Sequence, residues 1–462
     1  MRKLFNILIT LLLIMTTQAK TYSAAIDKTI AQSDINKGAV SVSVKDAETG
    51  KVIYKLNDKQ PTMPASTLKL ITLGASLDTL GDDYEFSTKL YKTTNNDLYL
   101  KLGADPFLTS AGLNSLMEKA VKDKKITSPK IIYIDDYIFD KTEWGEGWQW
   151  DDDLNPLMPK FSSYNIDKNL LSIIIAPTNL GSPAQIYTTK FYPVTFMNLV
   201  ITGKENDIEL NRNNSIAPNI LNISGTINKQ ITEEIPINNP KRYFILRLED
   251  AIKSAKMDYY GSFPQKKTPA TNVYLVAEIK PPATNVYLVA EIKHPISQAV
   301  KAILMNSNNF VAETVFKLAG AKFVNNTGSL SHSQEMLDAY FKKIGIDAKD
   351  IKIVDGSGVS KNNIITTDFM TDYLVKQSKN EVLKNSMPTA GEGTLRNRML
   401  YFKDNLRAKT GTLSDVSGIA GYITSRSGKT YAFDIMINDP KTKSNDKKSL
   451  EEYIIRDIYT SY

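Results

Sequence analysis

The most constraining stretch of the chain is an apolar run that begins at Pro64 and ends at Gly81. Pro64 suits the first turn of a helix, where a missing backbone N–H leaves no hydrogen bond unmade, and Gly81 suits its end. Apolar residues recur between them at Leu68, Ile71, Leu73, Ala75, Leu77 and Leu80. A helix that is apolar nearly all round belongs inside a core, so the sequence predicts a buried central helix.

Two side chains with reactive chemistry stand in the first turn of this helix, Ser66 and Lys69. A spacing of three residues places them on one helix face, where the positive end of the dipole would favour an oxyanion at Ser66. A hydroxyl beside a partly neutral amine is a nucleophile with its base, and desolvation or nearby positive charge lowers a lysine pKa. The alternative is a serine near a helix start with a solvated lysine. Because Ser-x-x-Lys is common by chance, the pair needs support from elsewhere.

Composition excludes several other chemistries. There is no cysteine, so thiol nucleophiles, disulfides and thiolate metal sites are excluded. The two histidines, His294 and His332, lie outside any His-Glu-x-x-His pattern, so we expect no metal and no cofactor. A Ser-His-Asp triad stays open, although no Gly-x-Ser-x-Gly elbow supports one. The net charge of +7 indicates a lysine-rich solvated exterior or attraction to an anionic wall or membrane surface, and we expect no nucleic-acid partner.

The N-terminus has the pattern of a secretory signal peptide. Arg2 and Lys3 precede an apolar run from Leu4 to Met15, and Thr17-Gln18-Ala19 suits a cleavage site. We therefore expect residues 1–19 to be a signal peptide and the mature chain to be exported, to the periplasm. The run is shorter than the about 20 apolar residues of a membrane span, although an uncleaved anchor or loose membrane attachment is the alternative.

Strand patterns dominate the next part of the chain. Residues Ala39–Val44 alternate with period two and Val52–Tyr54 return after a turn, which predicts an antiparallel hairpin. From residue 86 to 265, short apolar runs alternate with turn residues, with one helical pattern at Ala111–Val121. We expect strand-rich inserted material there, in two small subdomains.

An aromatic and acidic loop lies within this inserted region. All three tryptophans occur between Trp144 and Trp150, and Asp151, Asp152 and Asp153 follow them. Such a loop could recognise an aliphatic amine, or it could be a packed corner with no binding role.

A short perfect repeat follows the inserted region. Pro269–Lys280 recurs letter for letter as Pro282–Lys293, with Pro281 between the copies. The repeat is too short for a solenoid and indicates a tandem duplication of one strand. We expect the second copy to hold the core position, because it keeps its connection to the motif that follows. The first copy would be an added edge strand or a displaced loop.

Two further motifs stand in the C-terminal half. Ser307 and Asn309 lie in a turn between two helical patterns, where Ser and Asn also serve as helix caps. Lys409-Thr410-Gly411 lies at or next to a sheet strand, where a glycine permits close approach of a ligand. The Gly-rich turns at 355–358 and 389–394 lack the P-loop spacing, so nucleotide binding is weakly supported.

Three elements therefore stand in chain order: Ser66-x-x-Lys69, Ser307-x-Asn309 and Lys409-Thr410-Gly411. Such a set is typical of β-lactamases and penicillin-binding proteins. The sequence resembles the class C low-molecular-mass penicillin-binding proteins, the D-alanyl-D-alanine carboxypeptidase/endopeptidase family. Further matching stretches are 64–66, 102–106, 305–313, 355–358 and 391–395. One departure is Asn308, where an Asp is frequent in this family.

The resemblance implies acyl transfer with a defined role for each catalytic residue. Ser66 would attack the carbonyl of a D-Ala-D-Ala bond and Lys69 would take its proton. Ser307, with Asn309 and Lys409 around it, would relay a proton to the leaving amine. The implied partners are peptidoglycan stem peptides as substrates and β-lactams as covalent inhibitors.

The resemblance also implies a substrate-binding strand. Lys409 and Thr410 would bind the terminal carboxylate, Gly411 would let the ligand approach, and the backbone N–H groups of Ser66 and Thr412 would form the oxyanion hole.

The fold implied by the resemblance is mixed α/β (α+β). A domain like the serine β-lactamases and penicillin-binding transpeptidases, with an antiparallel sheet flanked by helices, would comprise 25–85 and 282–462. The inserted region 86–265 and the duplicated strand 269–293 would interrupt it. A β-lactamase and a non-catalytic peptidoglycan-binding protein are the alternatives; the long insertion between Ser66 and Ser307 favours the peptidase.

Overall fold

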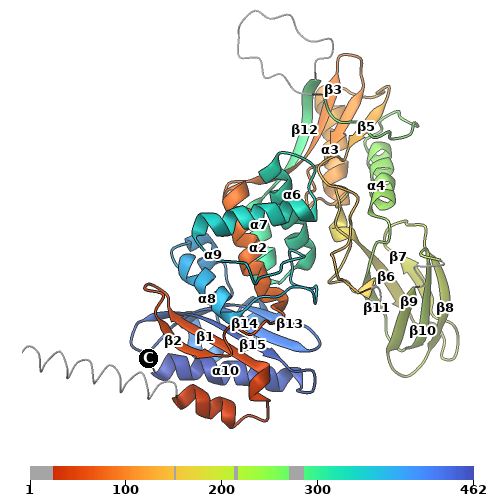
Figure 1. Ribbon diagram of the computed structural model, residues 1–462. Coiled ribbons are helices and arrows are strands. Elements are labelled where there is room, and N and C mark those ends of the chain that lie inside the picture. Colours follow the sequence, from red (N-terminus) through yellow and green to blue (C-terminus); the bar gives the residue numbers. More distant parts are fainter. Residues whose placement is uncertain (1–23, 150–151, 213–216, 270–285, 462) are drawn as a thin grey trace, which may run out of the picture. The chain divides into compact units, whose positions relative to one another are not determined.

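The computed structural model describes residues 24–149, 152–212, 217–269 and 286–461 (Figure 1). The expected signal peptide, 1–19, lies outside these residues. The chain divides by its contacts into two compact units. Unit 1 comprises the chain up to Asp82, Ser297–Asn308 and everything from Gln334 onward. Unit 2 comprises Asp83–Ile296 and Asn309–Ser333.

Unit 1 is built on one antiparallel sheet of five strands in the order β13-β14-β15-β1-β2. The strands are β1 (Val40–Asp46), β2 (Val52–Leu56), β13 (Leu406–Thr412), β14 (Val416–Thr424) and β15 (Thr430–Asn438). The predicted hairpin is confirmed, because β1 and β2 pair directly. Nearly every residue of β14 and β15 and most residues of β13 are buried, so this sheet is covered on both faces.

Helices cover the two faces of this sheet (Figure 1). Val42 and Ile435 point to the face that carries α10 (Ser444–Ser461), where they share a core with Ile454. On the other face, Lys45 forms an ion pair with Asp368 of α8 (Thr367–Lys376). The remaining helical elements that unit 1 contains wholly or in part are residues 24–31, η1 (Lys37–Ala39), η2 (Ala65–Leu68), α2 (Lys69–Leu80), α5 (Ile296–Met305), α7 (Leu330–Ile344), α9 (Glu381–Asn385), η5 (Gly393–Leu395) and η6 (Leu400–Asn405).

The predicted buried helix is α2, and it ends at Gly81 as expected. It packs beside α8, whose Tyr373 hydroxyl donates to the Leu70 carbonyl over 2.8 Å. Its beginning differs from the prediction, because Ser66 lies in the 3₁₀ turn η2 and the α-helix starts only at Lys69. Ala65 opens that turn with a φ of 47°, a left-handed conformation that an alanine rarely adopts.

Unit 2 contains three small sheets and three helices among the residues described. The first sheet has the order β12-β3-β4-β5, the second β11-β6-β7 and the third β8-β10-β9. Their strands are β3 (Glu85–Thr93), β4 (Leu98–Lys101), β5 (Ile132–Asp135), β6 (Leu170–Ala176), β7 (Gln185–Thr188), β8 (Thr195–Thr202), β9 (Asp207–Arg212), β10 (Ile220–Ile227), β11 (Ile231–Pro236) and β12 (Val286–Pro295). The helices are α3 (Ser110–Lys124), α4 (Pro240–Ser254) and α6 (Asn309–Val324), with a 3₁₀ turn η4 (Asp167–Asn169). One apolar core includes residues from all three sheets, and the division of the inserted region into two subdomains stays a prediction.

The second copy of the repeat forms most of β12, which pairs antiparallel with β3. It is a strand, as expected, but it lies at the edge of its sheet as far as the described residues show, and Ala290 is its one buried residue. The first copy lies outside the described residues beyond Pro269. Because β12 belongs to unit 2, unit 1 resumes at Ser297, later than the residue 282 expected for the peptidase domain.

The expected fold class is confirmed: an antiparallel sheet flanked by helices, with strand-rich inserted material. None of the helices described is both long and apolar enough to pass through a bilayer.

Candidate active site

The hydroxyl of Ser66 and the amine of Lys69 are in direct contact. The Lys69 Nζ donates to the Ser66 Oγ over 2.8 Å, and the lysine side chain is fully buried. The same amine donates to the backbone carbonyl of Ser357 over 2.6 Å. A buried amine held against a hydroxyl is the arrangement in which a lysine can take a proton from a serine.

The turn at 355–358 holds this amine in place. The carboxylate of Asp355 accepts hydrogen bonds from the backbone of Gly358 and Ser360 at 2.8 and 2.7 Å. Gly358 has a φ of +80°, and a Cβ there would lie 1.9 Å from the Ala65 carbonyl oxygen. The turn therefore touches the Ser66 segment as closely as a glycine allows. The sequence showed the Asp-Gly-Ser-Gly pattern but not its contact with Lys69.

Lys409 and Ser307 form the second pair. The Lys409 Nζ donates to the Ser307 Oγ over 2.8 Å and to the Thr410 carbonyl over 2.7 Å, and Lys409 is fully buried. Burial, and then the positive charge of Lys69, lower the pKa of Lys409 well below its usual range. The effect of Lys69 on Lys409 indicates that the two amines lie in one electrostatic environment. Ser307 has a φ of 55°, a strained conformation of the kind that clusters at functional sites.

The strand β13 meets the Ser66 turn at Gly411. A Cβ at Gly411 would lie 2.9 Å from both the Ser66 nitrogen and the Pro64 carbonyl oxygen. This contact brings the Lys409-Thr410-Gly411 motif against the Ser66 segment. The exposed Thr412 ends the strand.

The second Gly-rich turn supports both Ser307 and Thr410. Thr410 Oγ1 donates to Thr394 Oγ1 over 2.9 Å. Gly393 has a φ of +48°, and a Cβ there would lie 2.5 Å from the Met305 carbonyl oxygen, two residues before Ser307. Both glycine-rich turns are thus supports for the motifs, in place of the phosphate loops that their composition could suggest.

Asn309 is the one expected catalytic residue that lies in unit 2, as the first residue of α6. Its side-chain amide donates to the Leu157 carbonyl over 3.0 Å. The contacts described above join Ser66, Lys69, Ser307, Lys409, Thr410 and Gly411 within unit 1.

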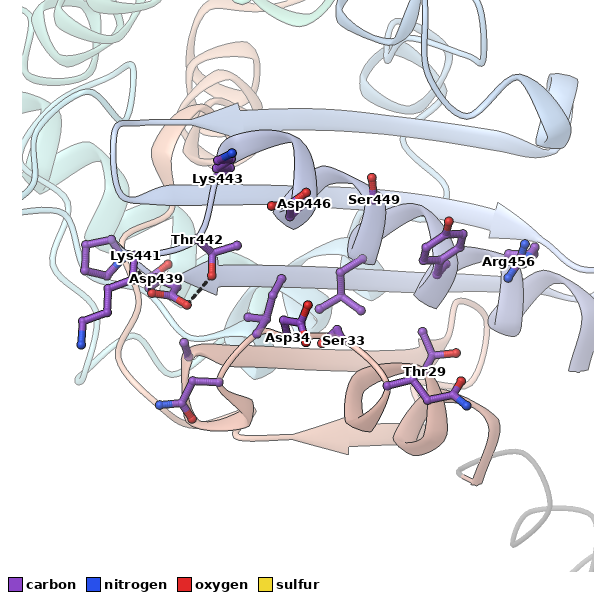
Figure 2. Close-up of a pocket in the computed structure, with 18 residues that line it drawn as sticks. Thr29, Ser33, Asp34, Asp439, Lys441, Thr442, Lys443, Asp446, Ser449 and Arg456 are labelled. Carbon is purple, nitrogen blue, oxygen red and sulfur yellow. Dashed lines mark hydrogen bonds between the residues drawn. The ribbon is translucent and has the colours of Figure 1, made fainter.

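The large cavity in unit 1 lies on the other face of the sheet. Figure 2 shows this cavity, which has a volume of about 1040 Å³ and is bordered by Asp34, Asp439 and Arg456. Its wall includes Leu450 of α10. Leu450 belongs to the apolar core between the sheet and α10, and this core also contains Leu406 and Ala408 of β13. Because side chains alternate along a strand, Lys409 points away from that core. The reactive side chains are therefore on the face opposite the cavity.

The D-Ala-D-Ala carboxypeptidase 3 (S13) family matches residues 22–456, nearly the whole chain. The chain belongs to this family. The D-alanyl-D-alanine carboxypeptidase of Actinomadura sp. (strain R39) is 26% identical over 434 residues, which is 87% of this chain and 78% of the relative. The expected family and the expected class of enzyme, a serine peptidase, are thereby confirmed.

Solved structures support the fold. Penicillin-binding protein 4 of Haemophilus influenzae matches with a TM-score of 0.79 and 23% identity, over 91% of this chain and 96% of that one. A structure of the same protein complexed with a β-lactam matches with a TM-score of 0.76 and 22% identity, over 94% and 99% of the two chains.

Proposed function

We propose that this member of the S13 family hydrolyses D-Ala-D-Ala bonds in peptidoglycan stem peptides, with Ser66 as the nucleophile. The observation that carries the proposal is the 2.8 Å contact between the Ser66 hydroxyl and the buried Lys69 amine. The whole chain has two histidines, and this scarcity favours a lysine as the general base.

The proposed reaction has two halves. Ser66 Oγ attacks the carbonyl of the D-Ala-D-Ala bond while Lys69 accepts the hydroxyl proton. Ser307, held by Lys409, delivers a proton to the leaving amine, so that D-Ala departs and an ester to Ser66 remains. Asn309 is the third residue of the Ser307-x-Asn309 motif, and we assign it to the same step. Water then attacks the ester and releases the shortened peptide.

The residues at the C-terminal end of β13 bind the substrate. Lys409 and Thr410 bind the terminal carboxylate, and Gly411 leaves room for it beside the Ser66 turn. The backbone N–H groups of Ser66 and Thr412 bind the developing oxyanion, where the loss of one donor typically lowers a rate by ~10²–10³.

A β-lactam would acylate the same hydroxyl, and its ester would be long-lived. The H. influenzae protein, similar in fold, has been crystallised with a β-lactam bound, which supports this extension. The basic and apolar pattern of residues 2–19 supports export to the periplasm as the place of action.

The test is release of free D-Ala from a diacetylated Lys-D-Ala-D-Ala peptide, run beside cleavage of cross-linked muropeptide dimers. We expect release by the wild-type chain and loss of both activities in Ser66→Ala, whose fold is checked by circular dichroism. Muropeptide binding without release, unchanged in Ser66→Ala, would instead indicate a non-catalytic wall-binding protein. Rapid turnover of a chromogenic cephalosporin would indicate a β-lactamase.

A further inference from the structure

A second cavity lies in unit 2, with a volume of about 480 Å³. This volume is in the range of pockets that hold small organic ligands. Apolar surface comes from Trp144, Pro218, Pro236 and Ile237, and polar groups come from Asp153, Lys160, Arg212, Asn219, Asn238 and Asn239. None of the reactive side chains proposed above lines it, so its role is independent of the proposed function.

Arg212 is the most unusual group in the wall. Its side chain is 4% exposed, and its Nη1 lies 3.5 Å from the nearest carboxylate oxygen, on Asp153. Its Nη2 donates to the Pro236 carbonyl over 3.2 Å, and its buried Nε has no partner among the residues described. Burial lowers the pKa of this guanidinium, and Asp153 offsets that effect only in part. A buried guanidinium whose Nε–H donor lacks an acceptor favours the binding of a ligand that supplies one.

Two other groups add positive potential at the same place. Lys160 donates to the Asn238 carbonyl over 2.7 Å, and its nearest carboxylate, Glu143, is 3.9 Å away. Burial raises the pKa of Glu143, and the positive charges of Lys160 and Lys317 oppose that effect. Asn239 caps the N-terminus of α4, where the helix dipole also favours an anion.

We propose that this cavity binds a small monocarboxylate that carries an amide and an aliphatic or sugar-ring portion. Arg212 and Lys160 contact the carboxylate, and the indole of Trp144 forms the apolar wall. The amides of Asn219 and Asn239 are placed for the polar groups of the ligand. Asp153 in the wall makes a dianion such as phosphate a poorer fit than a single carboxylate, because like charges at close range repel.

Two sources supply this chemistry, the C-terminus of a short peptide and a sugar acid. The peptide probe is N-acetyl-D-Ala-D-Ala and the sugar probe is N-acetylmuramic acid. Their uncharged counterparts are the dipeptide amide and N-acetylglucosamine. The full chain carries Ser66→Ala so that no peptide is consumed.

The measurement is ¹⁹F NMR of chain labelled with 5-fluorotryptophan. The chain has three tryptophans, and Trp144→Phe identifies the resonance of the cavity wall. We expect at least one carboxylate to shift the Trp144 resonance saturably, with its uncharged counterpart at least about tenfold weaker. The probe that binds identifies the source.

Variants decide whether the shift comes from this cavity. Lys160→Gln and Arg212→Gln should each weaken binding by about tenfold, while Lys204→Gln, an exposed lysine of the same unit, should leave it unchanged. Should Arg212→Gln fail to fold, Lys160→Gln carries the test. The proposal is overturned if neither carboxylate gives a saturable shift, if the uncharged counterparts bind equally well, or if Lys160→Gln binds like its parent.

Discussion

Lys409 in unit 1 and Lys317 in unit 2 are both buried lysines, and their partners differ in kind. Lys317 forms an ion pair with Asp140 at 2.5 Å, donates to the Thr142 carbonyl, and lies over the ring of Phe139. Lys409 contacts a hydroxyl and a carbonyl, and within the described residues no carboxylate lies within ion-pair distance of it. Burial lowers the pKa of both amines, but Asp140 opposes the effect at Lys317 and Lys69 adds to it at Lys409.

This difference indicates that Lys317 has a structural role, whereas Lys409 has an amine that can take part in a reaction. A buried cation paired with a carboxylate has its charge compensated and its proton held. A buried cation beside another cation, with a hydroxyl and a carbonyl as its partners, has an amine that gives up its proton readily. Such an arrangement lowers stability and is retained where activity requires it.

Replacing Lys409 with Met should produce the largest effect. Without the amine that holds Ser307, acylation by a β-lactam should fall by about a thousandfold, comparable to the loss of other preorganised polar groups. Stopped-flow measurement of acylation tests this. A variant that acylates within tenfold of the wild type would remove Lys409 from the mechanism.

The same variant should be more stable than the wild type, and the gain should depend on pH. Because the pKa of Lys409 is lowered in the folded chain, the unfolded state binds more protons below about pH 10.4, and wild-type stability rises with pH up to that value. The advantage of Lys409→Met in urea unfolding should therefore shrink between pH 7 and 10. An advantage that grows over this range would contradict a lowered pKa of Lys409 in the folded chain.

Gly358→Ala should damage the support of Lys69. The added Cβ would lie 1.9 Å from the Ala65 carbonyl oxygen and at a positive φ, so the turn must move. We expect a loss of about 2–4 kcal/mol in unfolding free energy and slower acylation. Gly345→Ala is the matched control, because this glycine also has a positive φ but nothing lies within 4 Å of an added Cβ. Its unfolding free energy should fall only by the cost of the positive φ.

Asp434 of β15 extends the comparison to a buried acid. It is fully buried, and neither of its oxygens has a side-chain partner among the described residues, whereas Asp140 has Lys317. Burial, with a smaller effect from Glu451, raises the pKa of Asp434 well above its usual range. The unfolded state loses this proton above about pH 3.9, so the wild type loses stability as the pH rises through that value.

Asp434→Val, which keeps the side-chain volume similar, should therefore stabilise the chain by about 1–3 kcal/mol at pH 7 and by less at pH 4. Thermal unfolding at the two pH values measures the difference. Equal stabilisation at both would mean that the carboxyl does not titrate as described.

Lys317→Met should produce the smallest change and is the matched control for Lys409→Met. The Met side chain keeps the packing against Phe139, and Asp140 is partly exposed and can be solvated, so we expect a stability loss of about 1 kcal/mol. Acylation should stay within about twofold of the wild type. A loss of acylation similar to that of Lys409→Met would abolish the distinction between the two lysines.

The sequence predicted the elements that depend on local pattern. The β1–β2 hairpin, the buried helix α2 and the strand at Lys409 follow from periodicity and from glycine and proline positions. The three reactive motifs could be placed in order because each stands in a recognisable helix, turn or strand context.

Contacts between distant residues could not be predicted in this way. The carbonyl of Ser357 that receives the Lys69 amine is 288 residues away, and a glycine-rich turn has many other uses. The contact of Asn309 with Leu157 and the edge position of β12 depend on how unit 2 packs, which no local pattern encodes.

The role of Ser66 as the nucleophile is tested most directly by the intact mass of the folded chain after incubation with penicillin, followed by peptide mapping. We expect one covalent adduct per chain, on the peptide that contains Ser66, and no adduct on Ser66→Ala. A folded chain that gains no mass, or one that carries the adduct on another residue, would contradict it.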